Sequence, residues 1–194
     1  RDPELRSRVG ARARDDVRQR YLTRSIAASV SSAWKRLAEC GTPAQRALVV
    51  NFVLRAPLAH TGGGYKKIFL LAHFLADRGH DVHLYVEPIA HLRGKSLEQI
   101  RDFCADHFGS SDATIHRGHG QIGPSDVAVA TNWPTAPVVA QLENARLRSY
   151  FLQDYEAEFY ERNDPLRRAA ERTYDLPLLM IGIGRYLARR LGER

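Results

Sequence analysis

The chain has 194 residues, of which 44% are hydrophobic and 26% charged, and its formal net charge is +7. This composition is ordinary for a globular protein, and the length suffices for one well-buried domain. No stretch reaches the ~18 consecutive apolar residues of a membrane span, and the arginine-rich start lacks the apolar core of a signal peptide. We therefore expect a cytoplasmic protein, with peripheral contact at the inner face of the plasma membrane as an open alternative.

The positive charge is concentrated in an extension over residues 1–46, which carries eleven Lys/Arg and five Asp/Glu, whereas residues 47–194 are almost neutral. Apolar residues recur there at helical spacing over 18–38, with arginines between them. This helix either docks on its own domain or lies on an anionic membrane surface with Trp34 at the interface. We do not expect nucleic acid as a partner, because such a binder needs basic residues interleaved with aromatic ones on its domain, whereas residues 47–194 are almost neutral.

From residue 47 onward, strand-like and helix-like segments alternate. The largely apolar run at 47–54 is typical of a strand buried on both faces, and further strands are expected at 81–86, 113–116, 125–131, 148–153 and 178–183. Helices are expected at 65–78, at 96–108 behind a Ser96–Gln99 capping-box pattern, at 134–145, at 166–174 and after residue 184. This order predicts an α/β fold over 47–183, with a Rossmann-like parallel sheet and helices on both faces.

Cysteine and histidine give no sign of a metal centre. The two cysteines and eight histidines show no metal-ligand spacing, so we expect neither a metal nor another cofactor. Cys104 falls on the apolar stripe of its expected helix, which indicates a small buried thiol in a reducing compartment.

Three consecutive glycines, Gly62, Gly63 and Gly64, precede the helix expected at 65–78, and His60 lies beside them. The loop before them is too long for a dinucleotide fingerprint, and Lys66 is not placed as in a Walker loop. Free N–H groups at a helix start favour a phosphate or a sugar hydroxyl, and glycine lets such a ligand approach the backbone. A flexible connection is the alternative, and the residues leave both open.

Two further loops follow strand ends, where open parallel sheets bind their ligands. The segment "FLQDYEAEFYERND" brings carboxylates and aromatic rings together directly after a strand, namely Asp154, Tyr155, Glu156, Glu158, Phe159 and Tyr160. Such a mixture is typical of a carbohydrate site. The alternative is structural: Asp154 caps a helix and Phe159 belongs to the core. In "ATNWPTA", Asn132 and Trp133 either line a ligand cleft or pack inside.

Three segments resemble the N-terminal domain of GT-B glycosyltransferases of family four, in the rhamnosyltransferase-like branch that builds bacterial surface polysaccharides. "GGGYKKIFLLAHFLADRGHDVHLYV" is similar to the glycine loop, first helix and second strand of that family. "YFLQDYEAEFY" resembles the branch's "QDYEP-FY" segment, although Ala157 stands where proline is usual. "AAERTYDLPLLMIGIGRYLARRL" is similar to the elements that close the domain. The resemblance covers roughly residues 47–194.

The resemblance implies a retaining, metal-free transfer of a sugar, rhamnose among the candidates, from a nucleotide-sugar donor to a glycan or lipid-linked acceptor. It implies that the glycines at 62–64 approach the donor phosphates and that Asp154 faces the reacting sugar. It further implies that Tyr155, Glu156 and Tyr160 line the acceptor side.

The family's second domain, which holds the donor nucleotide, is not found before Arg194. Residues 184–194 are therefore expected to begin the link to it, and the 194 residues alone are expected to lack transferase activity. A non-catalytic sugar- or nucleotide-binding module is the alternative function.

Overall fold

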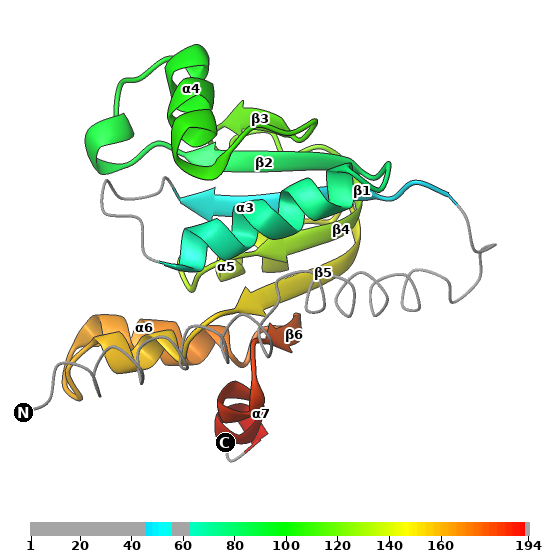
Figure 1. The fold of residues 1–194 in the computed structure, drawn as a ribbon. Helices are drawn as coiled ribbons and strands as arrows, with labels where there is room; N and C mark the ends of the chain where they lie inside the picture. Colours follow the sequence, from blue (N-terminus) through cyan, green and yellow to red (C-terminus); the bar gives the residue numbers. More distant parts are fainter. Residues whose placement is uncertain (1–45, 56–62, 193–194) are drawn as a thin grey trace, which may run out of the picture.

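A six-stranded, all-parallel sheet forms the centre of the protein, in a computed structural model that describes residues 46–55 and 63–192 (Figure 1). The strands are β1 (Val49–Arg55), β2 (Asp81–Glu87), β3 (Thr114–Arg117), β4 (Ser125–Ala130), β5 (Ala145–Leu152) and β6 (Leu179–Gly182). Their order in the sheet is β3-β2-β1-β4-β5-β6, so the winding direction reverses between β1 and β4. This is the strand order of a Rossmann-like fold, and the predicted fold class is confirmed.

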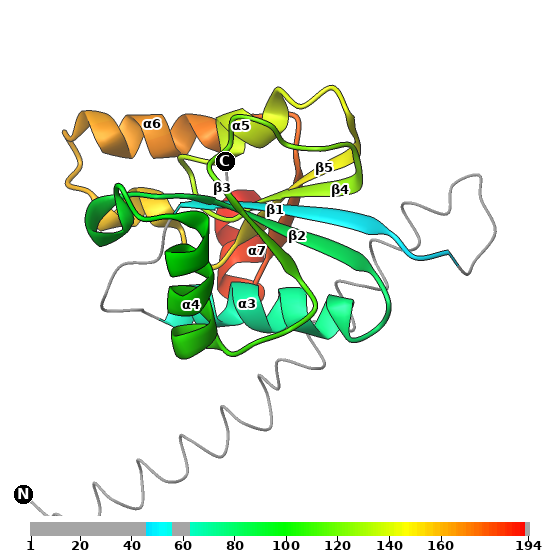
Figure 2. The same ribbon diagram turned by 90° about the horizontal axis from the view of Figure 1, so that it is seen from above.

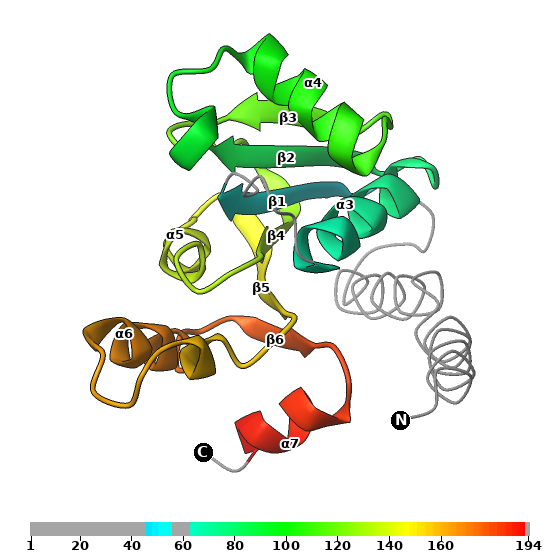
Figure 3. The same ribbon diagram turned by 60° about the vertical axis from the view of Figure 1, so that its left-hand side comes forward.

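Helices cover both faces of this sheet. They are α3 (Gly63–Ala76), α4 (Leu97–Phe108), α5 (Ala136–Ala140), α6 (Pro165–Thr173) and α7 (Arg185–Gly192), with short 3-10 turns η1 (Ala90–Leu92) and η2 (Glu156–Phe159). Seen from above, α3 and α4 lie on one face and α5 and α6 on the other (Figure 2). Helix α7 follows β6 at the end of the sheet opposite β3 (Figure 3).

The core has two parts because alternate residues of each central strand point to opposite faces. In β1, Phe52 and Leu54 pack in the cluster with α3 and α4, whereas Val53 packs in the cluster with α5, α6 and η2. In β5, Phe151 belongs to the first cluster and Tyr150 to the second. Both faces of these strands are therefore mostly apolar, which explains the largely hydrophobic runs in the sequence, and the polar Asn51 of β1 is buried among them.

Several local predictions are confirmed in detail. Ser96 and Gln99 form the capping box of α4: Ser96 Oγ accepts from the Gln99 N–H at 3.2 Å, and the Ser96 N–H donates to Gln99 Oε1 at 3.0 Å. Cys104 is buried, and burial raises the pKa of its thiol to about 12. No helix within the described residues is long and apolar enough to cross a membrane.

The bounds of two helices differ from the predictions by two residues or more, and one predicted helix is not described. Helix α3 begins at Gly63, two residues early, so Gly63 and Gly64 form part of its first turn. Helix α5 spans only Ala136–Ala140, because the chain turns at Gln141 and enters β5 at Ala145. The helix expected at 18–38, together with His60 and Gly62, lies outside the described residues.

Candidate functional site

A cavity of about 410 Å³ opens at the carboxyl ends of the central strands. Its walls come from Arg55 at the end of β1, residues 131–134 after β4, five residues after β5 (Gln153, Asp154, Glu156, Phe159 and Tyr160), and the first turns of α3. The strand order reverses between β1 and β4, so this cavity lies at the point where open α/β sheets bind ligands. In Figure 1 the arrowheads of β1 and β2 and the start of α3 mark this edge, on the left.

Most of the sequence-predicted site residues meet at this cavity, although they come from three separate segments. The lining includes Gly64, Asn132, Trp133, Asp154, Glu156 and Tyr160. Gly63 opens α3 next to Gly64. The fold therefore brings together the glycine segment, the loop after β4 and the loop after β5.

Tyr155 takes a different place from the one expected. Its side chain is buried and packs on Tyr174, with ring centroids 4.8 Å apart. The Arg190 guanidinium lies 4.6 Å from the centroid of its ring. The prediction that Tyr155 lines the acceptor side is not supported, because Tyr155 belongs to the core cluster under η2.

The structural alternatives for two neighbouring residues also fail. The cap of α6 is Asp164, which accepts from the Leu166 N–H at 2.7 Å, whereas Asp154 is exposed and lines the cavity. Phe159 is 67% exposed at the cavity edge and is therefore not a core residue.

Glu156 is the most constrained charged group of the cavity. Its Oε2 accepts a hydrogen bond from the Tyr150 hydroxyl at 2.6 Å and a second from the Trp133 backbone N–H. Burial raises the pKa of this carboxyl to about 7, and the negative charge of Asp154 acts in the same direction, while the two hydrogen bonds oppose the rise. Glu156 is therefore poised between acid and carboxylate near neutral pH.

An aromatic corner stands beside this carboxyl. Trp133 Nε1–H donates to the Tyr160 hydroxyl at 3.0 Å, and the two rings meet edge to face with centroids 6.2 Å apart. The loop that carries Trp133 is fixed by the buried Thr135, whose hydroxyl accepts from the N–H groups of Thr131 and Asn132 at 3.1 and 3.3 Å. The indole is thus held in place before any ligand arrives.

The cavity lining also contains Gln153, Arg55 and Tyr65, which the sequence patterns did not single out. A Cβ on Gly64 would lie 3.2 Å from Gln153 Oε1, so the absence of a side chain lets Gln153 lie against the helix start. Arg55 adds positive charge and pairs with Glu87 at 3.3 Å. Tyr65 also lines the cavity, and burial raises the pKa of its hydroxyl. The signal for Arg55 and Gln153 was their position as the first residues after apolar strand runs.

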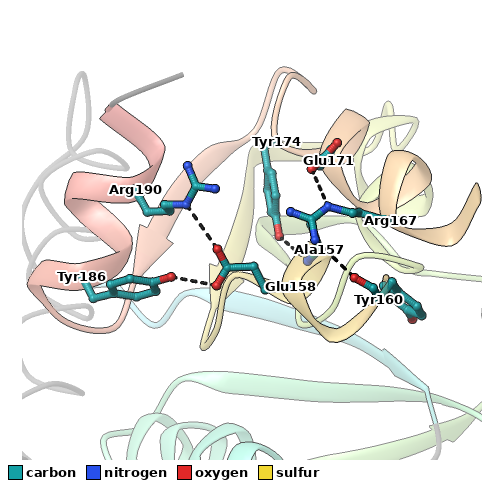
Figure 4. Close-up of polar contacts among 8 residues, drawn as sticks. All are labelled: Ala157, Glu158, Tyr160, Arg167, Glu171, Tyr174, Tyr186 and Arg190. Carbon is teal, nitrogen blue, oxygen red and sulfur yellow. Dashed lines mark hydrogen bonds and ion pairs between the residues drawn. The ribbon is translucent and has the colours of Figure 1, made fainter. Parts of the chain in front are cut away.

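Helix α6 supports the turn η2 that presents Glu156 and Tyr160 (Figure 4). The Ala157 N–H donates to the Tyr174 hydroxyl at 3.3 Å, and Arg167 donates to the Tyr160 carbonyl at 3.2 Å. Arg167 also pairs with Glu171 at 3.2 Å. These contacts fix the backbone of η2 at both ends.

Helix α7 contacts the outer side of the same turn (Figure 4). Glu158 accepts a hydrogen bond from the Tyr186 hydroxyl at 2.8 Å and one from Arg190 Nε at 3.4 Å. The Tyr186 bond and then the nearby arginine lower the pKa of Glu158, the opposite direction from Glu156. Two glutamates of one turn therefore point into different surroundings and titrate differently.

Within residues 46–55 and 63–192, no group of three or more His, Cys, Asp or Glu side chains is arranged to hold a metal ion. No protein-family model, no curated protein and no solved structure matches this chain.

Proposed function

We propose that the chain is the acceptor-side domain of a GT-B glycosyltransferase and that the cavity binds a sugar. The observation that carries the proposal is the composition of its wall, where the rings of Trp133, Phe159 and Tyr160 stand beside the carboxyl groups of Asp154 and Glu156. Aromatic faces stack on the apolar faces of sugar rings, and carboxylates accept hydrogen bonds from hydroxyls. A volume of about 410 Å³ suits a small ligand.

The reaction that we propose is the retaining transfer of a sugar, with rhamnose among the candidates, from a nucleotide-sugar to a glycan or lipid-linked acceptor. Asp154 is proposed to face the reacting sugar, because it is the exposed carboxylate of the cavity. Gly64 lies in the first turn of α3, where unpaired N–H groups and the helix dipole favour the donor phosphates. The buried free thiol of Cys104 agrees with a reducing, cytoplasmic location.

Saturation-transfer NMR on the 194-residue chain tests the proposal. The ligands are the methyl glycosides of glucose, galactose, mannose, N-acetylglucosamine and rhamnose, together with their nucleotide-sugars. We expect transfer to at least one glycoside, with the strongest signals from protons on one face of the ring that stacks.

The matched variants are W133F and W34F, which change the two tryptophans of the chain one at a time. W133F keeps the backbone N–H that Glu156 accepts but loses the indole bond to Tyr160. We expect W133F to weaken glycoside binding about tenfold or more, which corresponds to 1.4 kcal/mol, and W34F to leave it unchanged. Equal binding by W133F and wild type, or no binding of any ligand in the panel, would contradict the proposal.

A further inference from the structure

Only one of the two carboxyl oxygens of Glu156 accepts hydrogen bonds from described residues. Both of its hydrogen bonds, from the Tyr150 hydroxyl and the Trp133 N–H, end on Oε2. Among the described residues, no hydrogen bond ends on Oε1, and the side chain lines the cavity. Oε1 is therefore the oxygen that a ligand can contact.

An ionised carboxylate in this position lacks compensation. Removal from water destabilises the charge, and each hydrogen bond donated to the carboxylate offsets part of that penalty. Glu156 has two donors, which lower its pKa, but burial outweighs them and raises the pKa to about 7. A further donor at Oε1 would favour the carboxylate over the acid.

The charged and titratable groups around this carboxyl come from several elements. They are Asp154 before η2, Tyr150 of β5, Tyr174 next to α6, Tyr65 of α3 and Arg55 of β1. The three tyrosine hydroxyls have raised pKa values because of burial and stay neutral around pH 7. Arg55 is paired with Glu87. Glu156 is therefore the group of this set whose charge changes near pH 7.

We propose that Glu156 binds the ligand as a carboxylate whose Oε1 accepts a hydrogen bond from a ligand hydroxyl, and that this binding releases a proton. The inference rests on the proposed function, since it concerns the same cavity and the same class of ligand. It assigns a specificity: the ligand must present a hydrogen-bond donor at Oε1, so an acceptor hydroxyl satisfies the site and an ether oxygen at that place does not. It also makes occupancy depend on pH.

The size of the expected pH dependence follows from the linkage between ligand binding and the release of a proton. A charge-assisted hydrogen bond from a hydroxyl is stronger than a neutral one, so the bound ligand lowers the Glu156 pKa by about one or more. A ligand that favours the ionised form then binds about five- to tenfold more tightly at pH 8 than at pH 6. E156Q, which carries no titrating group at this position, binds equally at both pH values.

The test uses the 194-residue chain and the methyl glycoside that shows the strongest saturation transfer in the panel above. Its dissociation constant is measured by calorimetry at pH 6, 7 and 8 for wild type and E156Q. In parallel, ¹³C NMR of the glutamate carboxyl groups follows the Glu156 titration midpoint with and without the glycoside. We expect a midpoint near pH 7 that falls when the glycoside is added.

Two substitutions keep the test independent of the behaviour of E156Q. The Tyr150 ring is fully buried, and its hydroxyl donates a hydrogen bond that favours the carboxylate form of Glu156. Y150F removes this donor, so the titration midpoint of Glu156 should rise. E158Q makes the same chemical change on the exposed side of the same turn and should leave the Glu156 midpoint where it is.

The outcomes separate the two proposals. Glycoside binding that is flat with pH, equally steep in E156Q, or accompanied by a Glu156 midpoint near its ordinary 4.5 overturns this inference and leaves the sugar site standing. Absence of binding by every glycoside at every pH overturns the proposed function and this inference with it.

Discussion

Replacing Glu156 by glutamine should make the protein more stable than wild type as the pH rises. In the folded protein the carboxyl has a pKa of about 7, whereas its ordinary value is 4.5. The folded state therefore holds a proton that the unfolded chain has lost, and stability that is present below pH 4.5 is lost as the pH rises to about 7. Glutamine keeps an oxygen that can accept the bonds from Tyr150 and Trp133 but has nothing to titrate.

The magnitude follows from the two pKa values. Between pH 5 and pH 8, ionisation of Glu156 lowers the free energy of unfolding of the wild type by about 2.5 kcal/mol relative to E156Q. Groups such as histidines titrate in both proteins, so their contributions cancel in the difference. For a domain of this size, about 1 kcal/mol corresponds to a shift of roughly 2–4 °C in melting temperature.

Urea denaturation followed by circular dichroism at pH 5, 6, 7 and 8 measures this difference. E158Q is the control, because the pKa of Glu158 is lowered and its titration lies below this range. Its stability should run parallel to wild type from pH 5 to 8. If the difference between E156Q and wild type is the same at pH 5 and pH 8, the argument that Glu156 is buried without full compensation is refuted.

Three further predictions concern single features of the fold. S96A removes the side-chain cap of α4 and should lower the free energy of unfolding by about 1 kcal/mol in urea denaturation. S110A, which changes a serine that follows the helix, is the control, and no loss of stability in S96A would contradict the capping box. In a C40S background, Cys104 should react with a thiol reagent only after denaturation, because burial raises its thiol pKa to about 12; fast labelling of the folded protein would contradict this burial. G64A adds a methyl group 3.2 Å from Gln153 Oε1 and should weaken glycoside binding with little change in melting temperature; unchanged binding would place the ligand away from this wall.

The strands were predictable because each central strand is buried on both faces. Val50, Phe52 and Leu54 pack on one side of the sheet and Val53 on the other, so the sequence shows an apolar run that only Asn51 interrupts. Capping chemistry is equally local, as Ser96 and Gln99 show. Both signals depend on neighbours in the chain, and both led to the right elements.

The site was predictable only as far as strand ends locate it. The position after β4 and β5 was enough to select Asn132, Trp133, Asp154 and Glu156. The direction in which each side chain points could not be predicted, because it depends on the path of the chain through the four-residue 3-10 turn η2. Tyr155 was therefore expected at the ligand and lies in the core.

The hydrogen bonds of Glu156 show a second limit of sequence reasoning. One donor, Tyr150, is six residues away on β5, and the other is a backbone N–H of the loop after β4. Neither contact follows the residue spacing of a helix or a strand. The first joins a strand to the turn after it, and the second joins the loops that follow two neighbouring strands of the sheet. The perturbed carboxyl emerges only when the loops after both strands are placed side by side.

Asp154 and Glu156 together give the site its chemical character. They are two residues apart, with Tyr155 between them turned into the core, so both carboxyl groups reach the same cavity. Asp154 is exposed to water, whereas Glu156 is held by two donors and is poised to exchange its proton near pH 7. The negative charge of Asp154 helps to keep Glu156 protonated. Paired titratable groups with different surroundings are a common source of an exchangeable proton at neutral pH. The arrangement does not serve stability, because the charge of Asp154 and the partial burial of Glu156 both disfavour the ionised form of Glu156.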